Sequence, residues 1–311
     1  MNVDYLVSIC STTYNREKYI AQAIESWINQ VTNFEYEIII SDDCSTDTTT
    51  DIIESYIKNY PEKKITLLRS DKNQGYNLNS VKAYQEAKGK YIAQCDGDDY
   101  WIDVSKLQKQ IDFLESHPDF VMCFTNTLIV NDETGESRVA KLNIWDECST
   151  NEIISQHNSI EAQKIGEINT LGHMSSLVFK NNVLNEFPDW YATTYNNDDT
   201  LFVMLSKFGK AKFINENCTV YRVNSDGVST SNFSFEKDIK GRIKYYNELK
   251  SFLDYNFNKE INHLLALYYF KLTKLYFRNK NIFKALCSIY FILYFDFKVV
   301  FTKLLKKIFL K

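Results

Sequence analysis

No stretch of this sequence is long and apolar enough to predict a membrane-spanning helix. The longest uncharged apolar run, residues 285–295, has 11 residues, whereas a spanning helix needs about 20. The N-terminal segment MNVDYLVSIC contains an acid and only a short apolar run, which does not fit a signal peptide. These two absences predict a protein that is soluble or peripheral, in the cytoplasm or on the inner face of the plasma membrane.

The sequence also lacks the patterns of a disulfide framework and of a zinc site. Its 7 cysteines are odd in number, and no two of them have C-x-x-C spacing. Several lie inside apolar segments, which is typical of reduced, buried thiols in a cytosolic protein. The 4 histidines are scattered and have no metal-ligand spacing.

Basic residues are scarce outside the C-terminal end. The chain has a net charge of −4, yet residues 271–311 hold ten basic residues and a single acid, a net charge of +9. Residues 1–270 therefore carry −13. An acidic body is unsuited to nucleic acid, so no nucleic-acid partner is expected. The basic and aromatic tail predicts contact with anionic lipid instead.

The remaining composition is that of an ordinary folded protein, with 44% apolar and 24% charged residues. In the first hundred residues, helix signals alternate with strand signals at residues 5–10, 36–41, 65–69 and 91–95. Apolar residues at spacings of three and four mark the helices; the third helix is expected to bury Leu78, Val81 and Ala87. This alternation indicates βαβ units and an α/β fold.

The alternation loosens after about residue 118. Strand patterns return at residues 120–130, 175–180 and 211–223, with a helix at about 198–208. Residues 140–170 are polar and are expected to form loops and short helices over the site. From about residue 236 the pattern is helical. We therefore expect an α/β domain at residues 1–235 and a helical, basic and aromatic region at residues 236–311.

Polar side chains follow three of the predicted strands. The segments are STTYN at residues 11–15, DDCSTD at 42–47 and DGDDYW at 96–101. In open α/β sheets, ligands bind outside the carboxyl ends of the strands. Ordinary turn chemistry would explain one such segment, whereas three together predict a polar ligand lying across the strand ends.

The segment DGDDYW has two competing interpretations. Aspartate favours turns and Gly97 permits positive φ, so the segment could be an acidic turn. Alternatively, Asp96, Asp98 and Asp99 repel one another unless a cation intervenes, and their place at a strand end favours a divalent metal site. Mn²⁺ and Mg²⁺ prefer one or two carboxylates together with phosphate oxygens.

Four segments stand out by their order and spacing: VSICSTTYNREKYIAQAIES, EIIISDDCSTD, NQGYN and AKGKYIAQCDGDDYW. They resemble the nucleotide-sugar-binding half of family 2 glycosyltransferases of the bacterial surface-polysaccharide type, over residues 5–110 and again near 196–229. The resemblance implies the GT-A fold, a Rossmann-like, mostly parallel sheet flanked by helices. It also implies an inverting, metal-dependent hexosyl- or N-acetylhexosaminyltransferase. Such an enzyme moves a sugar from a nucleotide sugar, expected to be a UDP-sugar, to a hydroxyl of a glycan or lipid-linked glycan.

The resemblance further implies roles for individual residues on the donor side. The nucleotide pocket would be lined by Thr12, Thr13, Tyr14 and Asn73. Asp43 would hold the base, and Asp42 would support the turn. Asp96 and Asp98 would contact the ribose and the metal ion, Mn²⁺ or Mg²⁺, with Asp98 first for the metal. Asp99 is an additional candidate metal ligand.

The acceptor hydroxyl needs a base, which comes from a distant part of the chain. The family carries an acidic pair, often Glu-Asp, at the start of a helix that corresponds to YNNDDTLFVMLSKFG at residues 195–209. The resemblance thus implies Asp199 as the base and Asp198, which stands where Glu is common, as the runner-up. The plain alternative is that the two acids only cap the helix and interact with its dipole.

The segment VYRVNSDGVS at residues 220–229 resembles the family's Tyr-Arg-x-His segment. Arg222 matches the arginine and would pair with the diphosphate or simply with Asp226. Asn224 stands in place of the histidine and cannot titrate or bind a metal well. On the acceptor side, the resemblance implies His173 and Trp101.

Two functions of other classes stay open. A nucleotidyltransferase acting on a sugar phosphate also places paired aspartates on a metal, but it normally has a Gly-rich phosphate loop, and STTYNREKY has no glycine. A non-catalytic nucleotide-sugar-binding module would keep the fold without turnover. The tail also has two interpretations: a helical core whose lysines face water, or a helix at residues 296–311 on an anionic membrane.

Overall fold

The structure is a computed structural model that describes residues 5–140, 146–149, 152–154, 171–184, 186–194, 197–223 and 235–309. Side chains are described for all of these except residues 197–198 and 298–309. The chain divides into two compact units. The first holds Met1–Ile153, Ile168–Ala192 and Asn197–Gly227, and the second holds Ile154–Glu167, Thr193–Asn196 and Val228–Lys311. The expected boundary near residue 235 stays a prediction.

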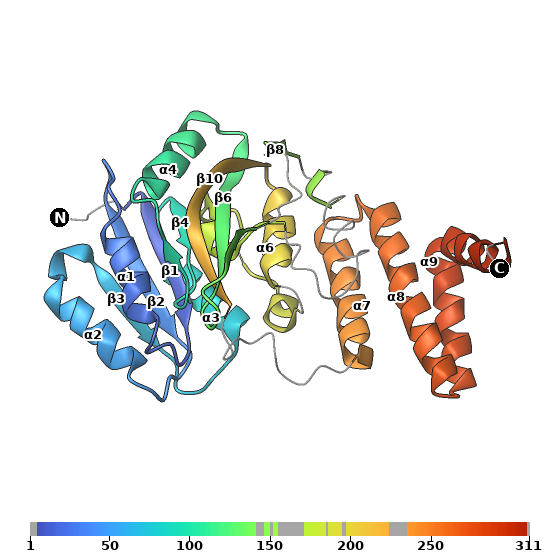
Figure 1. The fold of residues 1–311 in the computed structure, drawn as a ribbon. Coiled ribbons are helices and arrows are strands. Elements are labelled where there is room, and N and C mark those ends of the chain that lie inside the picture. Colours follow the sequence, from blue (N-terminus) through green and yellow to red (C-terminus); the bar gives the residue numbers. More distant parts are fainter. Residues whose placement is uncertain are drawn as a thin grey trace. The chain divides into compact units, whose positions relative to one another are not determined.

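A mixed sheet organises the first unit (Figure 1). Its strands are β1 (Val7–Thr13), β2 (Tyr36–Asp42), β3 (Ile65–Arg69), β4 (Tyr91–Gln94), β5 (Tyr100–Trp101), β6 (Phe120–Asn131), β7 (Ser137–Val139), β8 (Glu147–Cys148), β9 (Val178–Lys180) and β10 (Lys210–Val223). Their order is β3-β2-β1-β4-β9-β6-β10-β5, with β7 beside β6 and β8 beside β10. The neighbours from β3 to β4 are parallel, as are β6 and β10, whereas β9 is antiparallel to β4 and β6. The predicted α/β fold is confirmed.

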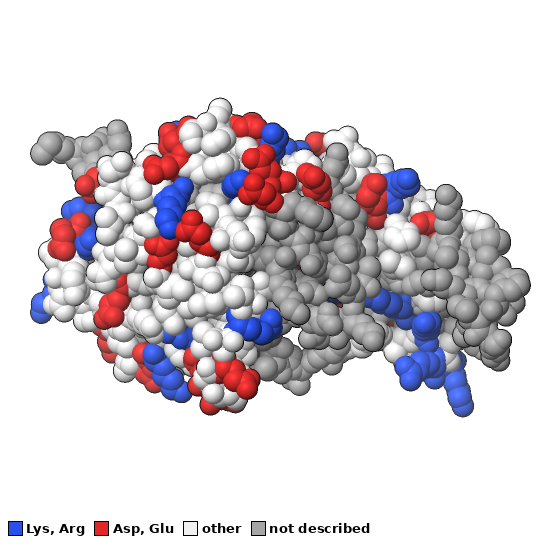
Figure 2. Space-filling view, turned by 45° about the horizontal axis from the view of Figure 1, so that its top comes forward, with Lys and Arg blue, Asp and Glu red and all other residues white. Residues whose placement is uncertain are grey.

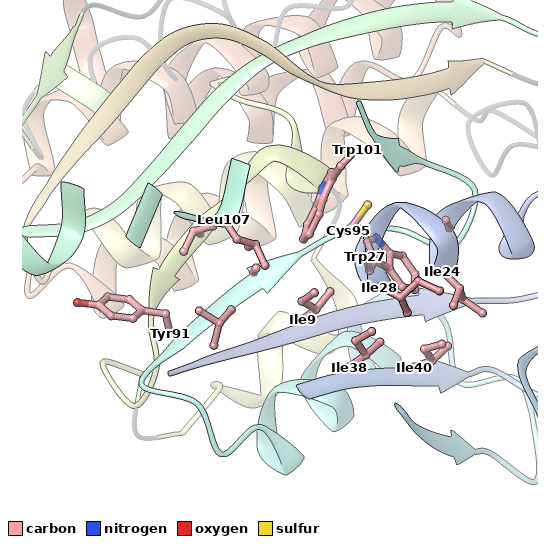
Figure 3. Close-up of a cluster of buried hydrophobic side chains, with 14 of the residues drawn as sticks. Ile9, Ile24, Trp27, Ile28, Ile38, Ile40, Tyr91, Cys95, Trp101 and Leu107 are labelled. Carbon is pink, nitrogen blue, oxygen red and sulfur yellow. The ribbon is translucent and has the colours of Figure 1, made fainter. Parts of the chain in front are cut away.

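The helices of this unit are α1 (Ile20–Ile28), α2 (Thr49–Asn59), α3 (Tyr76–Glu86), α4 (Lys106–Ser116) and α6 (Asn197–Ser206). Of these, α1, α2 and α4 pack with the sheet in one large apolar cluster. In Figure 3, Ile24 and Trp27 of α1 lie over Ile9, Ile38 and Ile40 of β1 and β2. Each such buried side chain stabilises the fold by roughly 1.5–3 kcal/mol. This cluster holds the polar strand ends on a rigid support.

The contacts of α3 with the sheet are polar. Asn79 Nδ2 donates to the Ser41 carbonyl (2.7 Å), and the Tyr84 hydroxyl donates to Gln94 Oε1 (3.0 Å). Leu78, expected in the core, is 42% exposed. The prediction of the buried face of α3 from apolar spacing was wrong, because the buried side chains of this helix are mostly amides and hydroxyls that pair with the sheet.

The segment predicted as a strand at residues 175–180 is divided in two. A 3₁₀ turn covers Met174–Ser176, and only Val178–Lys180 extends as β9. Two further 3₁₀ turns lie at Pro61–Lys63 and Asp189–Thr193. The 7 cysteines are all free; five are buried, Cys44 is partly buried and Cys287 is exposed.

The second unit is helical where it is described, as the sequence predicts. It contains α7 (Phe235–Phe252), α8 (Asn258–Arg278) and α9 (Ile282–Phe309). α9 is kinked at Asp296, which has φ −156° and ψ 97°. α8 and α9 pack through Ala266 and Ile292. Within the described ranges, no helix combines the length and the apolar character needed to cross a membrane.

Candidate functional site

The polar segments after β1, β2 and β4 lie at one edge of the sheet, because these strands are parallel neighbours. Thr13 pairs with Asp42 in the register. The Asp43 N–H donates to the Thr13 carbonyl (2.9 Å), and the Gly97 N–H donates to the Thr12 carbonyl (2.9 Å). The loops after β2 and β4 are therefore both fixed to the end of β1.

Gly97 is required by the close approach of two loops. A Cβ at this position would lie 2.9 Å from Thr13 Cβ and Oγ1 and 3.1 Å from the Thr12 carbonyl. Gly97 does not use the positive φ that a glycine permits; positive φ values near the site belong to Asn15 (51°), Cys44 (68°) and Gly75 (88°). Left-handed backbone is uncommon for residues with side chains and gathers at functional sites.

Asp96 is the most heavily hydrogen-bonded carboxylate of the acidic loop. Its Oδ1 accepts hydrogen bonds from Thr12 Oγ1 (3.2 Å), Tyr76 Oη (3.0 Å) and Gln94 Nε2 (3.0 Å). No hydrogen bond to its Oδ2 comes from the described part of the chain. Burial, and then the negative charge of Asp98, raises the pKa of Asp96 to about 6. A cation beside this carboxylate would be favourable.

Asp98 is paired with an arginine that the sequence reasoning did not single out. Arg16 Nε lies 2.8 Å from Asp98 Oδ2, and both side chains are largely buried. The Arg16 backbone N–H donates to Thr49 Oγ1 (2.7 Å), and its Nη1 donates to the Asn15 carbonyl (3.2 Å). The available signal was the position of a basic residue directly after the STTYN segment.

Asp99 lies deeper than its neighbours and uses both oxygens within the chain. Its Oδ2 accepts from Ser175 Oγ, and its Oδ1 accepts from the Arg222 N–H (3.1 Å). Burial, followed by the charges of Asp98 and Asp96, raises the pKa of Asp99. At 1% exposure, Asp99 is better placed to position the loop than to bind a metal.

Arg222 also serves the acidic loop. Its Nη1 donates to the Asp98 carbonyl and its Nη2 to Gln22 Oε1. Its guanidinium carbon lies 4.4 Å from the centroid of the Tyr100 ring. The side chain is 7% exposed, so its donors support the loop from within the protein. The other two positions of the VYRVNSDGVS segment singled out above lie outside the described residues: Asn224 and Asp226.

Asp42 and Asp43 hold two different turns. The Asp42 carboxylate accepts from the Ser45 N–H (2.9 Å), the turn-supporting contact that the resemblance implies. Asp43 Oδ1 accepts from the Gln74 N–H and its Oδ2 from the Gly75 N–H, both at 2.8 Å. Asp43 therefore fixes the NQGYN turn beside the strand ends.

The remaining nucleotide-side residues differ in exposure. Thr13 Oγ1 is buried and has no hydrogen-bond partner among the residues that the structure describes. Tyr14 is 41% exposed, and Asn73 is exposed while its Oδ1 accepts from the Gly75 N–H (3.2 Å). A buried hydroxyl without a partner is uncommon in folded proteins. Thr13 thus offers a polar group that a ligand at this edge can pair with.

One short segment, LGHMSS at residues 171–176, holds two distant parts of the site. Asp199, in the first turn of α6, is buried, and its Oδ1 accepts from the Leu171 N–H (2.9 Å). At the other end of the segment, Ser175 Oγ donates to Asp99 and accepts from the Asp96 N–H (3.1 Å). The side chain of Asp198 lies outside the described atoms.

The two residues expected on the acceptor side are both buried. His173 is 6% exposed, and burial lowers its pKa to about 4, so it is neutral at pH 7. Trp101 is 4% exposed and lies in the apolar cluster (Figure 3). Its indole N–H donates to the Ser175 carbonyl (2.7 Å). The expectation that Trp101 faces an acceptor is therefore corrected, because the ring packs in the core and supports Ser175.

Asp96 and Asp98 have the donor atoms that Mn²⁺ or Mg²⁺ prefers. Both are carboxylates, Asp96 Oδ2 receives no hydrogen bond from the described residues, and the two charges are close enough to raise a pKa. They do not form a three-ligand protein group. A cation bound there would complete its coordination with water and with phosphate oxygens of a ligand. The residues therefore fit a metal that is shared with a bound diphosphate.

The fold and this site define an α/β protein with a polar, acidic site at the carboxyl ends of parallel strands. The family model described as Glycosyl transferase family 2 matches residues 8–186, more than half of the chain. The chain therefore belongs to family 2 of the glycosyltransferases, as the resemblance implied.

Relatives by sequence support this membership. An uncharacterized protein of Mycobacterium tuberculosis is 31% identical over 224 residues, 71% of this chain and 60% of that protein. The Escherichia coli enzyme UDP-Glc:alpha-D-GlcNAc-diphosphoundecaprenol beta-1,3-glucosyltransferase WfaP is 39% identical over 127 residues, 41% of this chain and 48% of that enzyme. The chain thus spans less than two thirds of the length of these curated relatives.

Solved structures share the fold. The crystal structure of S. aureus TarS 1–349 in complex with UDP-GlcNAc has a TM-score of 0.60 and 19% identity, over 90% of this chain and 89% of that one. The mannosyltransferase PcManGT from Pyrobaculum calidifontis, in complex with GDP-Man and Mn²⁺, has a TM-score of 0.52 and 14% identity, over 94% and 86%. The GT-A fold with a C-terminal helical extension is confirmed.

Proposed function

We propose that this chain is an inverting, metal-dependent glycosyltransferase. It moves a sugar from a nucleotide sugar, expected to be a UDP-sugar, to a hydroxyl of a glycan or lipid-linked glycan. The observation that carries the proposal is the LGHMSS segment, which contacts Asp199 through Leu171 and the acidic loop through Ser175. Direct displacement at a sugar carbon requires a leaving-group site and a base that are held at a fixed position relative to each other. A segment that contacts both Asp199 and the acidic loop suits that requirement.

The donor side of the proposal uses the strand-end loops. Asp98 and Asp96 would hold Mn²⁺ or Mg²⁺, which neutralises the charge that develops on the diphosphate when the sugar–phosphate bond breaks. Asp43 and the Thr13 hydroxyl, which has no partner in the described ranges, lie at the adjoining strand ends and would contact the nucleoside. Arg16, beside Asp98, supplies a guanidinium that can pair with a phosphate oxygen.

The acceptor side of the proposal centres on Asp199. Its carboxylate would take the proton of the acceptor hydroxyl while that oxygen attacks the sugar from the face opposite the diphosphate, which inverts the configuration. The Leu171 N–H holds one of its oxygens in place. Asp198 is the alternative base. Burial lowers the pKa of His173 to about 4, so His173 would act as a neutral hydrogen-bonding group.

The named relatives support the choice of substrates and setting. The name of the E. coli relative specifies UDP-Glc and a diphosphoundecaprenol-linked acceptor, and TarS is in complex with UDP-GlcNAc. PcManGT, in complex with GDP-Man and Mn²⁺, favours manganese as the ion to test first and makes GDP the alternative nucleotide. We infer a role in cell-envelope polysaccharide assembly at the cytoplasmic face of the membrane, with the basic tail contacting anionic lipid.

Donor binding is tested by thermal unfolding of the full chain with UDP, GDP and their sugar conjugates, each with and without Mn²⁺. A ligand at 100 times its Kd stabilises the folded state by about 2.7 kcal/mol, a rise of several degrees for a chain of this size. We expect the largest rise with a UDP-sugar and Mn²⁺ together. If no nucleotide raises the unfolding temperature under any metal condition, the donor site is refuted.

The base is tested with Asp199→Asn, because Asn Oδ1 can still accept the Leu171 N–H. We expect donor binding to be retained, while UDP release in the presence of a lipid-linked glycan extract falls at least about 10²-fold. Asp198→Asn is the matched control and should lower the rate by less than Asp199→Asn. Full activity of Asp199→Asn would remove this residue from the mechanism, and the reverse order of the two variants would assign the base to Asp198.

A further inference from the structure

One side of α9 is apolar and exposed over the first half of the helix. Six large side chains there are between 45 and 77% exposed: Phe283, Leu286, Tyr290, Leu293, Tyr294 and Phe297. Their helical spacing places them on one side, referred to below as the apolar face of α9. The other side carries Ala285, Ser288 and Ile292, which are at most 4% exposed. Ile292 packs with Ala266 of α8.

This face differs from the solvent-facing side of an ordinary helix, which is polar. Between residues 282 and 295 the single charged residue is Lys284. Isolated exposed apolar residues are common, but a contiguous patch of large ones marks a contact site. The segment before the kink at Asp296 is about 20 Å long at 1.5 Å per residue, too short for the roughly 30 Å of a bilayer core. A membrane-bound α9 would therefore lie along the surface.

Basic residues stand at both ends of the apolar face. Before it or at its start are Arg278, Lys280 and Lys284, and after it are Lys298, Lys303, Lys306 and Lys307. The one acid of residues 271–311 is Asp296, whose Oδ2 lies 2.7 Å from His263 Nδ1. In Figure 2, one group of basic side chains lies at the lower part of the C-terminal helices, whereas basic and acidic side chains are interspersed on the α/β unit.

The charge distribution decides which partner fits this face. A second copy bound through the same face would bring two segments of net charge +9 together, which is repulsive. An anionic bilayer accepts the apolar side chains at its interface and pairs the flanking lysines with its headgroups. Tyr290 and Tyr294 also suit an interface, because a tyrosine ring is apolar and its hydroxyl remains in water.

We propose that the apolar face of α9 binds the surface of an anionic lipid membrane, with the helix lying in the plane of the interface. The sequence predicts lipid contact through residues 296–311; the geometry points to the segment before Asp296 as the part that enters the membrane. The proposal does not depend on sugar transfer. A variant that loses membrane binding should keep the nucleotide response of the α/β unit, which separates failure of one proposal from failure of the other.

The test is flotation of the full chain with vesicles of 30% phosphatidylglycerol and 70% phosphatidylcholine in 0.1 M NaCl. The triple variant Phe283→Ser, Leu286→Ser, Tyr290→Ser should lower the partition coefficient at least about tenfold. The matched control is a triple variant whose members are 45 to 65% exposed on the α/β unit: Val31→Ser, Val104→Ser and Phe208→Ser. It should float like the wild type, and circular dichroism should show that both variants fold.

Insertion is measured separately at Cys287, an exposed thiol beside Leu286. In a Cys44→Ser background, an environment-sensitive fluorophore on Cys287 should shift its emission to the blue when vesicles are added. Three results would overturn the proposal: flotation of the face variant equal to wild type, release of the wild type by 0.5 M NaCl down to the level of that variant, or no emission shift. Dimerisation that the face variant abolishes, without vesicle binding, would assign the face to a second copy.

Discussion

Two groups of acidic side chains in the α/β unit differ in what balances their charge. In the first, Lys109 Nζ lies 2.8 Å from Asp103 and 2.5 Å from Glu216. Burial alone would raise the pKa of Asp103, but hydrogen bonds from Lys109 and Ser105 outweigh it and lower the pKa below its usual range. With Cys218, these two acids form the one three-ligand group that a metal could use within the described ranges. A lysine already supplies the cation there.

The second group, Asp96, Asp98 and Asp99, is incompletely balanced. Among the described residues, this group makes an ion pair between Asp98 and Arg16. Burial and the neighbouring carboxylates raise the pKa values of Asp96 and Asp99, even though both accept several hydrogen bonds. The comparison teaches that the proximity of metal-binding residue types alone is a weak guide to a metal site. A site that awaits a cation keeps an excess of negative charge, and this group at the strand ends keeps it.

The largest expected difference between the two groups is in activity. Asp98→Asn removes the first candidate metal ligand and should lower UDP release at least about 10²-fold. It should also abolish the Mn²⁺-dependent part of the thermal response to UDP. Glu216→Gln removes a carboxylate from the balanced group and should keep the rate within about twofold, because an exposed ion pair contributes little. Equal losses in the two variants would show that the comparison does not identify the site.

A second, smaller difference is expected from Ser175, the residue that joins the acidic loop to the LGHMSS segment. Ser175→Ala leaves the buried carboxylate of Asp99 without its hydroxyl partner, which costs about 1–3 kcal/mol of unfolding free energy. Loss of such a supporting contact should also weaken the apparent Mn²⁺ affinity in the presence of UDP by about 10- to 100-fold.

The neighbouring serine provides the control for this prediction. Ser176 is equally buried, and its hydroxyl donates to the His173 carbonyl (2.7 Å) without touching a carboxylate. Ser176→Ala should cost similar stability and leave the Mn²⁺ affinity unchanged, whereas Ser175→Thr should restore part of it. If Ser175→Ala and Ser176→Ala change the Mn²⁺ titration equally, Ser175 has a packing role only.

Much of the fold could be predicted from the sequence because its strands are continuous apolar runs. The segment at residues 65–69 was placed correctly, and the strand ends carried recognisable polar segments. The face of α3 could not be predicted, since Asn77, Asn79 and Ser80 are buried there. Apolar periodicity is blind to polar side chains that pair with a sheet.

Only those site residues could be predicted whose residue type and neighbours in the sequence already indicate a function. The aspartates of the acidic loop belong to that class, since like charges in a row require an explanation. Arg16, Tyr76 and Ser175 do not, because their roles come from contacts across 82, 20 and 79 positions of sequence. Trp101 was misassigned for a similar reason. An aromatic residue next to an acidic loop suits a sugar-stacking surface or a core equally well, and tertiary packing decides.

The smallest expected difference is in the pH dependence of stability without divalent cations. The pKa of Asp96 is about 6 in the folded protein and about 3.9 in an unfolded chain. The folded state therefore binds more protons between these values, and Asp96 favours folding increasingly as the pH falls from about 6 to about 4. Asp103 changes the stability with pH in the opposite direction, because its pKa is lowered in the folded protein. Its contribution is present above pH of about 4 and is lost on further acidification.

Chemical unfolding at pH 7 and pH 4.5 separates the contributions of Asp96 and Asp103 to the free energy of unfolding. Relative to Asp96→Asn, the wild type should gain about 2 kcal/mol of unfolding free energy on acidification, and saturating Mn²⁺ with UDP should cancel the gain because they bind the ionised carboxylates. Relative to Asp103→Asn, the wild type should change little over this range. Parallel curves for wild type and Asp96→Asn would mean that neither burial nor the charge of Asp98 raises the pKa of Asp96. The excess negative charge that distinguishes the strand-end group would then be absent, and with it the electrostatic reason for a cation there.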